Sequence, residues 1–197
     1  MKQIEITTRV NETLEEAIKK LEKHGFKKVR ESKVKDIYLT QKKKDLNKKN
    51  IIEILSSCVL LRYLKINDEQ VIKKITYKNK VYDDNQVISE EKINLNCEDL
   101  NIAYKLFQAL KFEKLTEVKY DVLVMKKNNL EFAFQNVNNL GLLLEYENLN
   151  DFEEKSNEEI LEEKKTMIKE LKSYGLNISN EIDVKKAYEL VLKSLQI

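Results

Sequence analysis

Polar and apolar residues alternate along several stretches of this chain, a pattern typical of β-strands with one apolar face. The first stretch is IEITTRV, residues 4–10, whose polar positions Glu5, Thr7 and Arg9 fall on one side of the alternation. Further strand-like stretches lie near residues 34–40, 58–66, 70–78, 86–95, 117–127, 130–136 and 142–148. The pattern therefore predicts about eight strands.

Helical periodicity occurs in two internal segments and near the C-terminus. Residues 12–24 carry apolar side chains at helical spacing, and Gly25 follows as a C-terminal stop. A second helix is expected at about 98–110. From about residue 156 the sequence predicts a helical tail, with two helices separated around YGLNISN.

The length of 197 residues fits one domain with an ample core. No internal repeat and no linker rich in Pro, Gly or Ser divides the chain, so we expect a single domain over residues 1–197. Many antiparallel strands in one domain either stack as two sheets or close on themselves, and closure removes the exposed edges. A barrel or tunnel is therefore one expected arrangement.

The charge balance gives little information about partners, because 36 basic and 34 acidic residues leave a net charge of +2. One stretch, KKKDLNKKN at residues 42–50, is strongly basic and is a candidate for contact with nucleic acid or polyphosphate. It lies between two predicted strands and lacks aromatic side chains for base stacking. We therefore interpret it as a solvated hairpin tip, and nucleic acid is not an expected partner.

The cysteines and the histidine exclude two common kinds of site. Cys58 and Cys97 have no CxxC spacing, and His24 is the only histidine, so structural zinc and a Cys/His nucleophile lack the residues they need. No stretch has the apolar character of a secretory signal or of a membrane helix of about 20 residues. A cytoplasmic location without a membrane partner is therefore expected.

The polar faces of the predicted strands either coat an exterior or line an interior. Burying many charges is unfavourable unless they are paired or bind a metal or a charged ligand. Basic side chains bind phosphate oxygens, and carboxylates bind hard cations such as Mg²⁺ or Mn²⁺. If the faces line an interior, they indicate a polyanion held with divalent cations. A solvated face gives the same periodicity. The charged or polar positions in question are Glu5, Thr7, Arg9, Arg62, Lys74, Thr76, Lys78, Glu145 and Glu147.

The order of these motifs resembles the CYTH superfamily, the triphosphate tunnel metalloenzymes, which include class IV adenylate cyclases, thiamine triphosphatases and inorganic triphosphatases. The motifs run from Ile4 to about Leu192 and read IEITTRV, DIYL, VLLRYL, ITYKNK, ISEEK, KLTEVKYD, LEFAFQNVNNLGLLLEYE and KKAYELVL. The resemblance implies an α+β fold, an eight-stranded antiparallel β-barrel or triphosphate tunnel with helices packed outside. It also implies a triphosphate-containing small molecule as ligand and Mg²⁺ or Mn²⁺ as cofactor.

The resemblance assigns roles to individual residues. Glu5 matches the first glutamate of a Glu-x-Glu-x-Lys signature, and Arg9 stands at its lysine. Glu145 and Glu147 match the closing pair of glutamates. The implied catalytic and metal-binding residues are Glu5, Glu145 and Glu147, and the implied phosphate-binding residues are Arg9, Arg62, Lys78 and Lys119.

The chain departs from the family pattern at several positions. Thr7 replaces the second glutamate of the signature, Asp121 replaces the arginine of a Lys-x-Arg pair, and Gln135 stands where an aspartate is common. A further acidic position is matched by Glu90 or Glu91, with the register left open. The loss of these carboxylates weakens the expectation of two bound cations.

The function expected from this site is divalent-metal-dependent binding and slow hydrolysis of a triphosphate: inorganic triphosphate, thiamine triphosphate or a nucleotide. Two alternatives stay open: a non-catalytic relative that binds polyphosphate or nucleotides, and a class IV-type adenylate cyclase. The organic part of the substrate, the preferred metal and the formation of a homodimer are also left open by the sequence.

Overall fold

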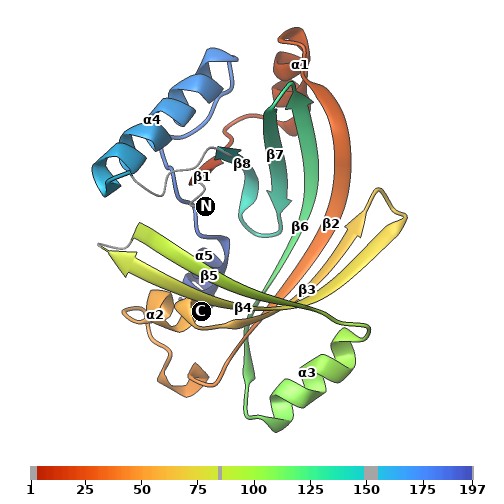
Figure 1. The fold of residues 1–197 in the computed structure, drawn as a ribbon, viewed down its shortest axis with the longest axis vertical. Coiled ribbons are helices and arrows are strands. Elements are labelled where there is room, and N and C mark those ends of the chain that lie inside the picture. The colour runs from red at the N-terminus through yellow and green to blue at the C-terminus, as the bar shows by residue number, and fades with distance from the viewer. Residues whose placement is uncertain (1–3, 84–85, 149–154, 197) are drawn as a thin grey trace. The chain divides into compact units, whose positions relative to one another are not determined.

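The structure, a computed structural model, describes residues 4–83, 86–148 and 155–196, with the side chains of 78–92 and 157 left aside. Its elements alternate much as the sequence pattern predicts (Figure 1). In chain order they are β1 (Ile4–Arg9), α1 (Leu14–Lys23), β2 (Lys27–Thr40), the 3-10 turn η1 (Lys43–Asp45), α2 (Ile51–Ser56), β3 (Val59–Ile66), β4 (Gln70–Asp83), β5 (Gln86–Asn96), α3 (Leu100–Ala109), β6 (Glu113–Lys127), β7 (Leu130–Val137), β8 (Gly141–Asn148), α4 (Asn157–Ser173) and α5 (Lys186–Ser194).

The strands form an eight-stranded sheet in the order β1-β8-β7-β6-β2-β3-β4-β5. The expected α+β class and the antiparallel eight-stranded sheet are confirmed. The expected closure is not seen, because β1 and β5 stand at the two ends of this order in the described part of the chain. Periodicity specifies which residues share a face of a strand, but it does not specify whether the first and last strands pair.

The chain divides into two compact units. Unit 1 comprises residues 1–31 and 121–185, and unit 2 comprises residues 32–120 and 186–197. Strands β2 and β6 each contribute residues to both units. The single domain expected from the sequence stays a prediction, since compact units that share strands of one sheet are not by themselves separate domains.

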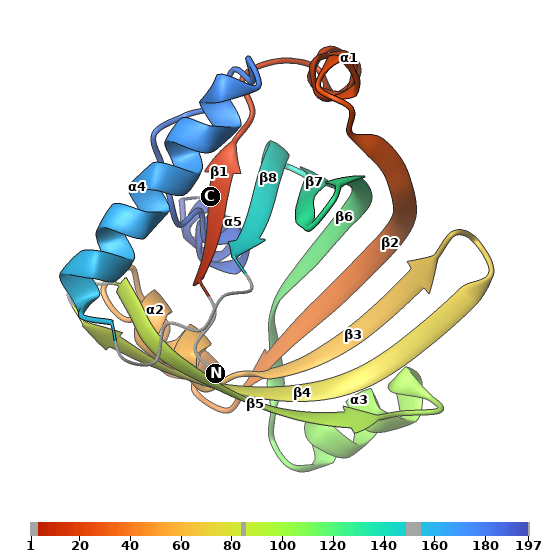
Figure 2. The same ribbon diagram turned by 45° about the horizontal axis from the view of Figure 1, so that its top comes forward.

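The core of unit 1 lies on one face of β1, β8 and β7. Because side chains alternate along a strand, Ile4 and Ile6 of β1 enter this core while Glu5, Thr7 and Arg9 take the opposite face. Helix α1 begins with a capping box between Thr13 and Glu16, and α4 packs along β1 (Figure 2). Buried members of the core include Ile4, Ile6, Leu21, Phe132, Phe134, Leu144, Tyr146, Met167 and Leu171.

Unit 2 contains the β3–β4 and β4–β5 hairpins and three helices. Helix α3 covers the sheet through Ala103, Tyr104 and Phe107, which pack with Leu61 and Ile75. Helices α2 and α5 share a second cluster that includes Ile51, Ile54 and Val191.

Residues 42–50 are mostly exposed and lie in the connection between the paired antiparallel strands β2 and β3, as expected, but this connection is longer than a simple hairpin turn. This exposed stretch contains η1 and leads directly into α2. Ile51 and Ile54, spaced three residues apart, are both buried against Val191 and its neighbours, and this contact stabilises a short helix between the two strands.

The C-terminal tail is helical, as predicted. Helix α4 starts at Asn157 behind a capping box formed by Ser156 and Glu159. Across the described ranges, no helix combines the length with the apolar content that crossing a bilayer requires.

Candidate functional site

Four of the predicted site residues share one face of unit 1. In the antiparallel pairing of β1 with β8, Glu5 lies opposite Glu147 and Thr7 lies opposite Glu145. Arg9 follows two residues later on the same face of β1. Opposite residues in such a pair have Cβ atoms about 5 Å apart. These five residues define the β1–β8 polar face.

The β1–β8 polar face holds two like charges directly across from each other. Glu5 and Glu147 are both exposed, and Glu145 is half-buried. Like charges at opposite cross-strand positions are destabilising, by a few tenths to about 1 kcal/mol. A cation bound between the two carboxylates would reduce this repulsion.

Arg9 supplies the positive charge of this face. Its Nε lies 2.9 Å from Oε2 of Glu181, with side chains 31% and 53% exposed respectively. Ion pairs this exposed contribute about 1 kcal/mol or less. The guanidinium can therefore exchange Glu181 for an anionic ligand at little cost.

Gln135 of β7 fixes the orientation of one glutamate. Its Nε2 donates to Oε2 of Glu145 at 2.8 Å, and Gln135 is only 4% exposed. An aspartate at this position would repel Glu145, whereas the amide of Gln135 donates a hydrogen bond to its carboxylate. The substitution thus lowers the negative charge near Glu145 and leaves one carboxylate fewer for a second cation.

The carboxylates of the β1–β8 polar face are suitable ligands for Mg²⁺ or Mn²⁺, which prefer oxygen. Among the residues described, however, no three His, Cys, Asp or Glu side chains come together as a metal site. Magnesium is commonly held by one or two carboxylates together with substrate phosphates and waters. The donor set therefore fits a cation that is shared with a phosphate ligand rather than a cation held in a protein cage.

Arg62, in unit 2, is held by a buried carboxylate. Its Nε donates to Oδ1 of Asp36 at 2.7 Å and its Nη2 donates to Oδ2 at 2.6 Å. The Tyr120 hydroxyl lies 3.4 Å from both Nη2 of Arg62 and Oδ2 of Asp36. Asp36 and Arg62 are cross-strand partners on β2 and β3, with side chains 3% and 34% exposed. We call this group the Asp36–Arg62–Tyr120 network.

In this network the guanidinium of Arg62 stays protonated, and the carboxylate of Asp36 neutralises its positive charge. Burial by itself lowers the pKa of the guanidinium, but the hydrogen bonds to Asp36 outweigh burial and raise it. Lys186 lies over the ring of Tyr120, with Nζ 4.8 Å from the ring centroid. Because Asp36 uses only Nε and Nη2, the Nη1 donors of Arg62 are not part of this bidentate contact.

Lys119 does not share a face with the network. Its Nζ lies 2.8 Å from Oε1 of Glu117, a side chain that also receives Lys114 at 2.8 Å and Lys35 at 3.7 Å. Neighbouring residues of a strand point to opposite faces, so Lys119 points away from the face of Tyr120. The structure thus brings Lys119 to Glu117 and not to Arg62.

Glu117 is strongly acidic in this setting. Burial tends to raise the pKa of its carboxyl, but hydrogen bonds from Lys114 and Lys119 and the charge of Lys35 outweigh burial and lower the pKa to about 2. Glu117 therefore stays ionised throughout the neutral range and binds the three lysines.

Asp121 also departs from the expected phosphate-facing position. It is exposed, and it lies two residues before Leu123, a buried member of the unit 1 core. Alternation places Asp121 on the core side of β6, opposite to the side of Tyr120. The side chains of Lys78, Glu90 and Glu91 lie outside those that the structure describes, so their predicted roles stay predictions.

The sequence interpretation missed Asp36, Tyr120 and Glu181. A usable signal existed for Asp36, which stands in the strand-like stretch VKDIYL two residues from Val34 and Tyr38. A carboxylate on an otherwise apolar strand face needs a partner when it is buried. The partner itself lies on another strand and leaves no local signal.

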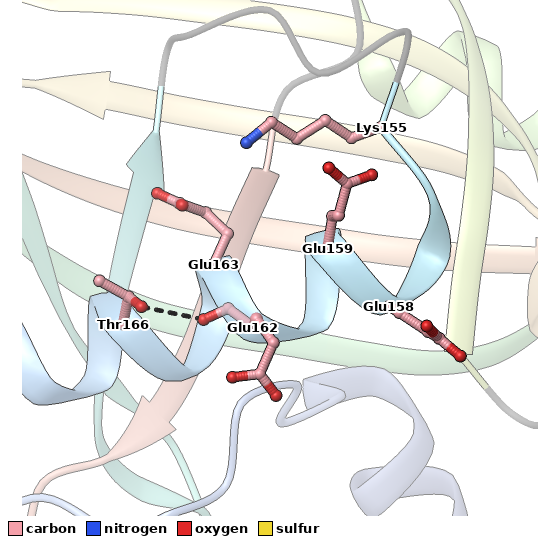
Figure 3. A pocket seen from close by; sticks show the side chains of 6 residues that line it. All are labelled: Lys155, Glu158, Glu159, Glu162, Glu163 and Thr166. Atoms are coloured by element: carbon pink, nitrogen blue, oxygen red, sulfur yellow. Dashed lines mark hydrogen bonds between the residues drawn. The ribbon is translucent and has the colours of Figure 1, made fainter.

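A shallow pocket of about 450 Å³ lies on α4, and none of the residues predicted above lines it (Figure 3). Glu158, Glu159, Glu162 and Glu163 line it together with Lys155 and Thr166. Thr166 Oγ1 donates to the backbone carbonyl of Glu162 at 3.0 Å, and Glu163 Oε1 accepts from Asn148 at 2.9 Å. The glutamates lie along the first turns of α4, and their carboxylates do not converge on a cation site among the described residues.

Comparison with known proteins gives relatives over nearly the full length of the chain. No model of a known protein family matches it. The chain is 27% identical over 189 residues to "Putative adenylate cyclase MJ0240" of Methanocaldococcus jannaschii, and the match covers 95% of this chain and 97% of that protein.

Solved structures show the same fold. The PH1819 protein of Pyrococcus horikoshii matches with a TM-score of 0.70 at 19% identity, covering 98% of this chain and 99% of that one. HpAC1 of Hippeastrum, an adenylyl cyclase homologue with a dominant triphosphatase activity, matches with a TM-score of 0.59 at 11% identity over 98% and 96% of the two chains. The chain therefore has the fold of the CYTH-type proteins, and the resemblance to this superfamily predicted from its motifs is confirmed.

Proposed function

We propose that this chain binds a triphosphate-containing small molecule together with Mg²⁺ or Mn²⁺ and hydrolyses it slowly. The observation that carries the proposal is the β1–β8 register, which sets Glu5 opposite Glu147 and adds Glu145 and Arg9 on the same face. The names of the relatives support it, since adenylate cyclase and triphosphatase both describe chemistry at a triphosphate.

Each charged residue of the β1–β8 polar face has a role in this proposal. Glu5, Glu145 and Glu147 would hold the cation, which when bound neutralises phosphate charge and polarises a phosphoryl oxygen. Arg9 exchanges Glu181 for a phosphate oxygen, because a guanidinium matches phosphate geometry in two parallel hydrogen bonds. Gln135 holds Glu145 in place during this exchange.

The support for phosphate binding differs among the basic residues of unit 2. The Nη1 donors of Arg62, which Asp36 does not engage, suit a phosphate oxygen, and Lys78 stays assigned to the same role. For Lys119 the support is weaker, because Glu117 already neutralises it on the other face of β6. Its assignment to phosphate binding rests on the motif resemblance alone.

Slow turnover follows from the charge of the site. Phosphoryl transfer depends mainly on positioning and on neutralising the charge of the phosphate oxygens. Thr7 brings no carboxylate and Gln135 brings an amide, so the face supports one cation better than two. Hydrolysis is favoured over cyclisation because water needs no positioned ribose hydroxyl.

A paired substitution tests the metal-dependent site. Glu145→Gln with Glu147→Gln keeps the shape of both side chains and removes both charges. We expect binding of inorganic triphosphate in the presence of Mn²⁺, measured by calorimetry, to weaken at least tenfold. The matched control is Glu158→Gln with Glu162→Gln, which removes the same charge from two exposed positions of α4 and should leave binding unchanged. Equal affinity for the two paired variants would refute the assignment.

An activity panel separates the three functions that the sequence leaves open. Phosphate release is measured from inorganic triphosphate, thiamine triphosphate and ATP, and cyclic AMP formation is measured from ATP, each with Mg²⁺ and with Mn²⁺. We expect slow phosphate release without cyclic AMP. Binding without any turnover would favour the non-catalytic relative, and cyclic AMP as the main product would favour the cyclase.

A further inference from the structure

Exposed apolar side chains gather on helix α3 of unit 2. Ile102, Leu106 and Leu110 are 68%, 56% and 52% exposed. Their spacing of four residues places them along one side of the helix. Soluble monomers seldom expose contiguous apolar groups without a binding role.

The fold of unit 2 does not require this outer stripe. Helix α3 already packs on the sheet through its other side, where Ala103, Tyr104 and Phe107 meet Ile75. A surface helix normally carries one apolar stripe toward the core and polar residues outside. Ile102, Leu106 and Leu110 form a second, exposed apolar stripe that flanks the packed one, and such a stripe is suited to a second packing partner.

The neighbouring strands carry further exposed apolar side chains. Tyr77, Ile93 and Leu95 are 37%, 58% and 62% exposed. Tyr77 lies opposite Ile93, and Leu95 lies opposite Ile75, so all of them share the sheet face on which α3 packs. Figure 2 shows α3 beside β4 and β5. We call Ile102, Leu106, Leu110, Tyr77, Ile93 and Leu95 the α3 apolar surface.

The charges around the helix suit a second copy of the same chain. Glu98 and Asp99 stand at the start of α3, and Lys111 follows its end. A two-fold axis at Leu106 would run two such helices antiparallel, with the acidic start of each beside Lys111 of the other. The same axis would place Ile102 against Leu110 of the second copy. A two-fold symmetric dimer requires a self-complementary surface, and the opposite charges at the two ends of α3 supply this complementarity.

We propose that the α3 apolar surface is the interface of a homodimer, formed by antiparallel contact of two α3 helices around Leu106. Burial of the exposed apolar side chains drives the association, and the end-to-end charge pairs set its direction. The interface is built from residues that take no part in the proposed triphosphate site, so dimer formation and ligand binding are tested separately.

Sedimentation velocity of the full chain tests the proposal. The unmodified protein should sediment as a dimer at micromolar concentration. Leu106→Glu should raise the dimer dissociation constant at least 100-fold, because it places two like charges at the symmetry axis. Val29→Glu is the matched control: Val29 is 49% exposed in unit 1, and its substitution should leave the dimer intact. A monomeric unmodified protein, or an intact dimer in Leu106→Glu, would overturn the proposal.

A charge exchange tests the direction of the helices. Lys111→Glu should weaken the dimer about tenfold, by setting like charges at both ends of the interface. Adding Glu98→Lys should restore most of the lost affinity, because the opposite charges again meet. No recovery in the double variant would overturn the antiparallel arrangement. Circular dichroism of each variant checks that the fold is retained.

Discussion

The β1–β8 polar face and the Asp36–Arg62–Tyr120 network both arise from alternation of polar and apolar residues along strands, but their charges have different partners. In unit 2 the residues opposite each other across β2 and β3 are Asp36 and Arg62, so the charges cancel within the protein. In unit 1 the opposite residues across β1 and β8 are Glu5 and Glu147, two like charges that do not neutralise each other. The identity of the cross-strand partner therefore decides whether a charged strand face becomes structural or becomes suited to a ligand.

The largest expected effect comes from breaking the neutral network. Arg62→Met leaves Asp36 buried without its counter-ion, which should lower the free energy of unfolding by about 3–5 kcal/mol. Urea unfolding measures this change. Arg9→Met is the matched substitution in unit 1, and it should cost about 1 kcal/mol or less, because the pair of Arg9 with Glu181 is exposed. Equal losses for the two arginines would remove the distinction between the regions.

A second substitution adds charge to the ligand-suited face. Thr7→Glu adds a fourth carboxylate to this face, directly opposite Glu145, so repulsion and burial should lower the stability of the metal-free protein by about 1–2 kcal/mol. In Mn²⁺ the same variant should bind inorganic triphosphate about tenfold more tightly and release phosphate faster, because it offers another ligand.

The control for Thr7→Glu is Asp121→Arg, which changes the other departure from the family signature. Since Asp121 lies on the core side of β6, this variant should bind triphosphate no more tightly than the unmodified protein. A gain from Asp121→Arg, or none from Thr7→Glu, would contradict the assignment of faces.

A smaller effect is expected at Glu117, a second site at which opposite charges neutralise each other within unit 2. Its pKa is lowered from 4.5 to about 2, so the carboxylate stabilises the fold above pH 4.5 and loses this contribution as the pH falls toward 2. Glu117→Gln should lower the free energy of unfolding at pH 7 by about 1–2 kcal/mol. The difference between the two proteins should shrink as the pH falls from 4.5 to 2. A difference that stays constant over this range would argue against the lysine contacts.

Much of the fold follows from local pattern, while the partners of the charges do not. Alternation in IEITTRV correctly places Glu5, Thr7 and Arg9 opposite the core, and helical spacing predicts α1 and α3 to within two residues. The contact of Asp36 with Arg62 depends on how two strands register, which neither stretch reveals alone. Helix α2 was missed because it is short and is stabilised by burial against α5.

The motif match placed Lys119 one position away from the face it was expected to occupy. Along a strand a shift of one residue reverses the face, so Tyr120, and not Lys119, meets Asp36 and Arg62. For Lys119, the pattern of buried and exposed residues along the strand is therefore a better guide to side-chain direction than the resemblance to a family motif.

The most direct test of the central claim is calorimetric titration of the unmodified protein with inorganic triphosphate, with Mn²⁺ present and with the metal removed by a chelator. Because the carboxylates of the β1–β8 polar face fit a cation shared with phosphate, triphosphate should bind in Mn²⁺ and at least tenfold more weakly in the chelator. Mn²⁺ titrated alone should bind weakly. Triphosphate binding of equal strength in both conditions, or no binding in either, would contradict the account.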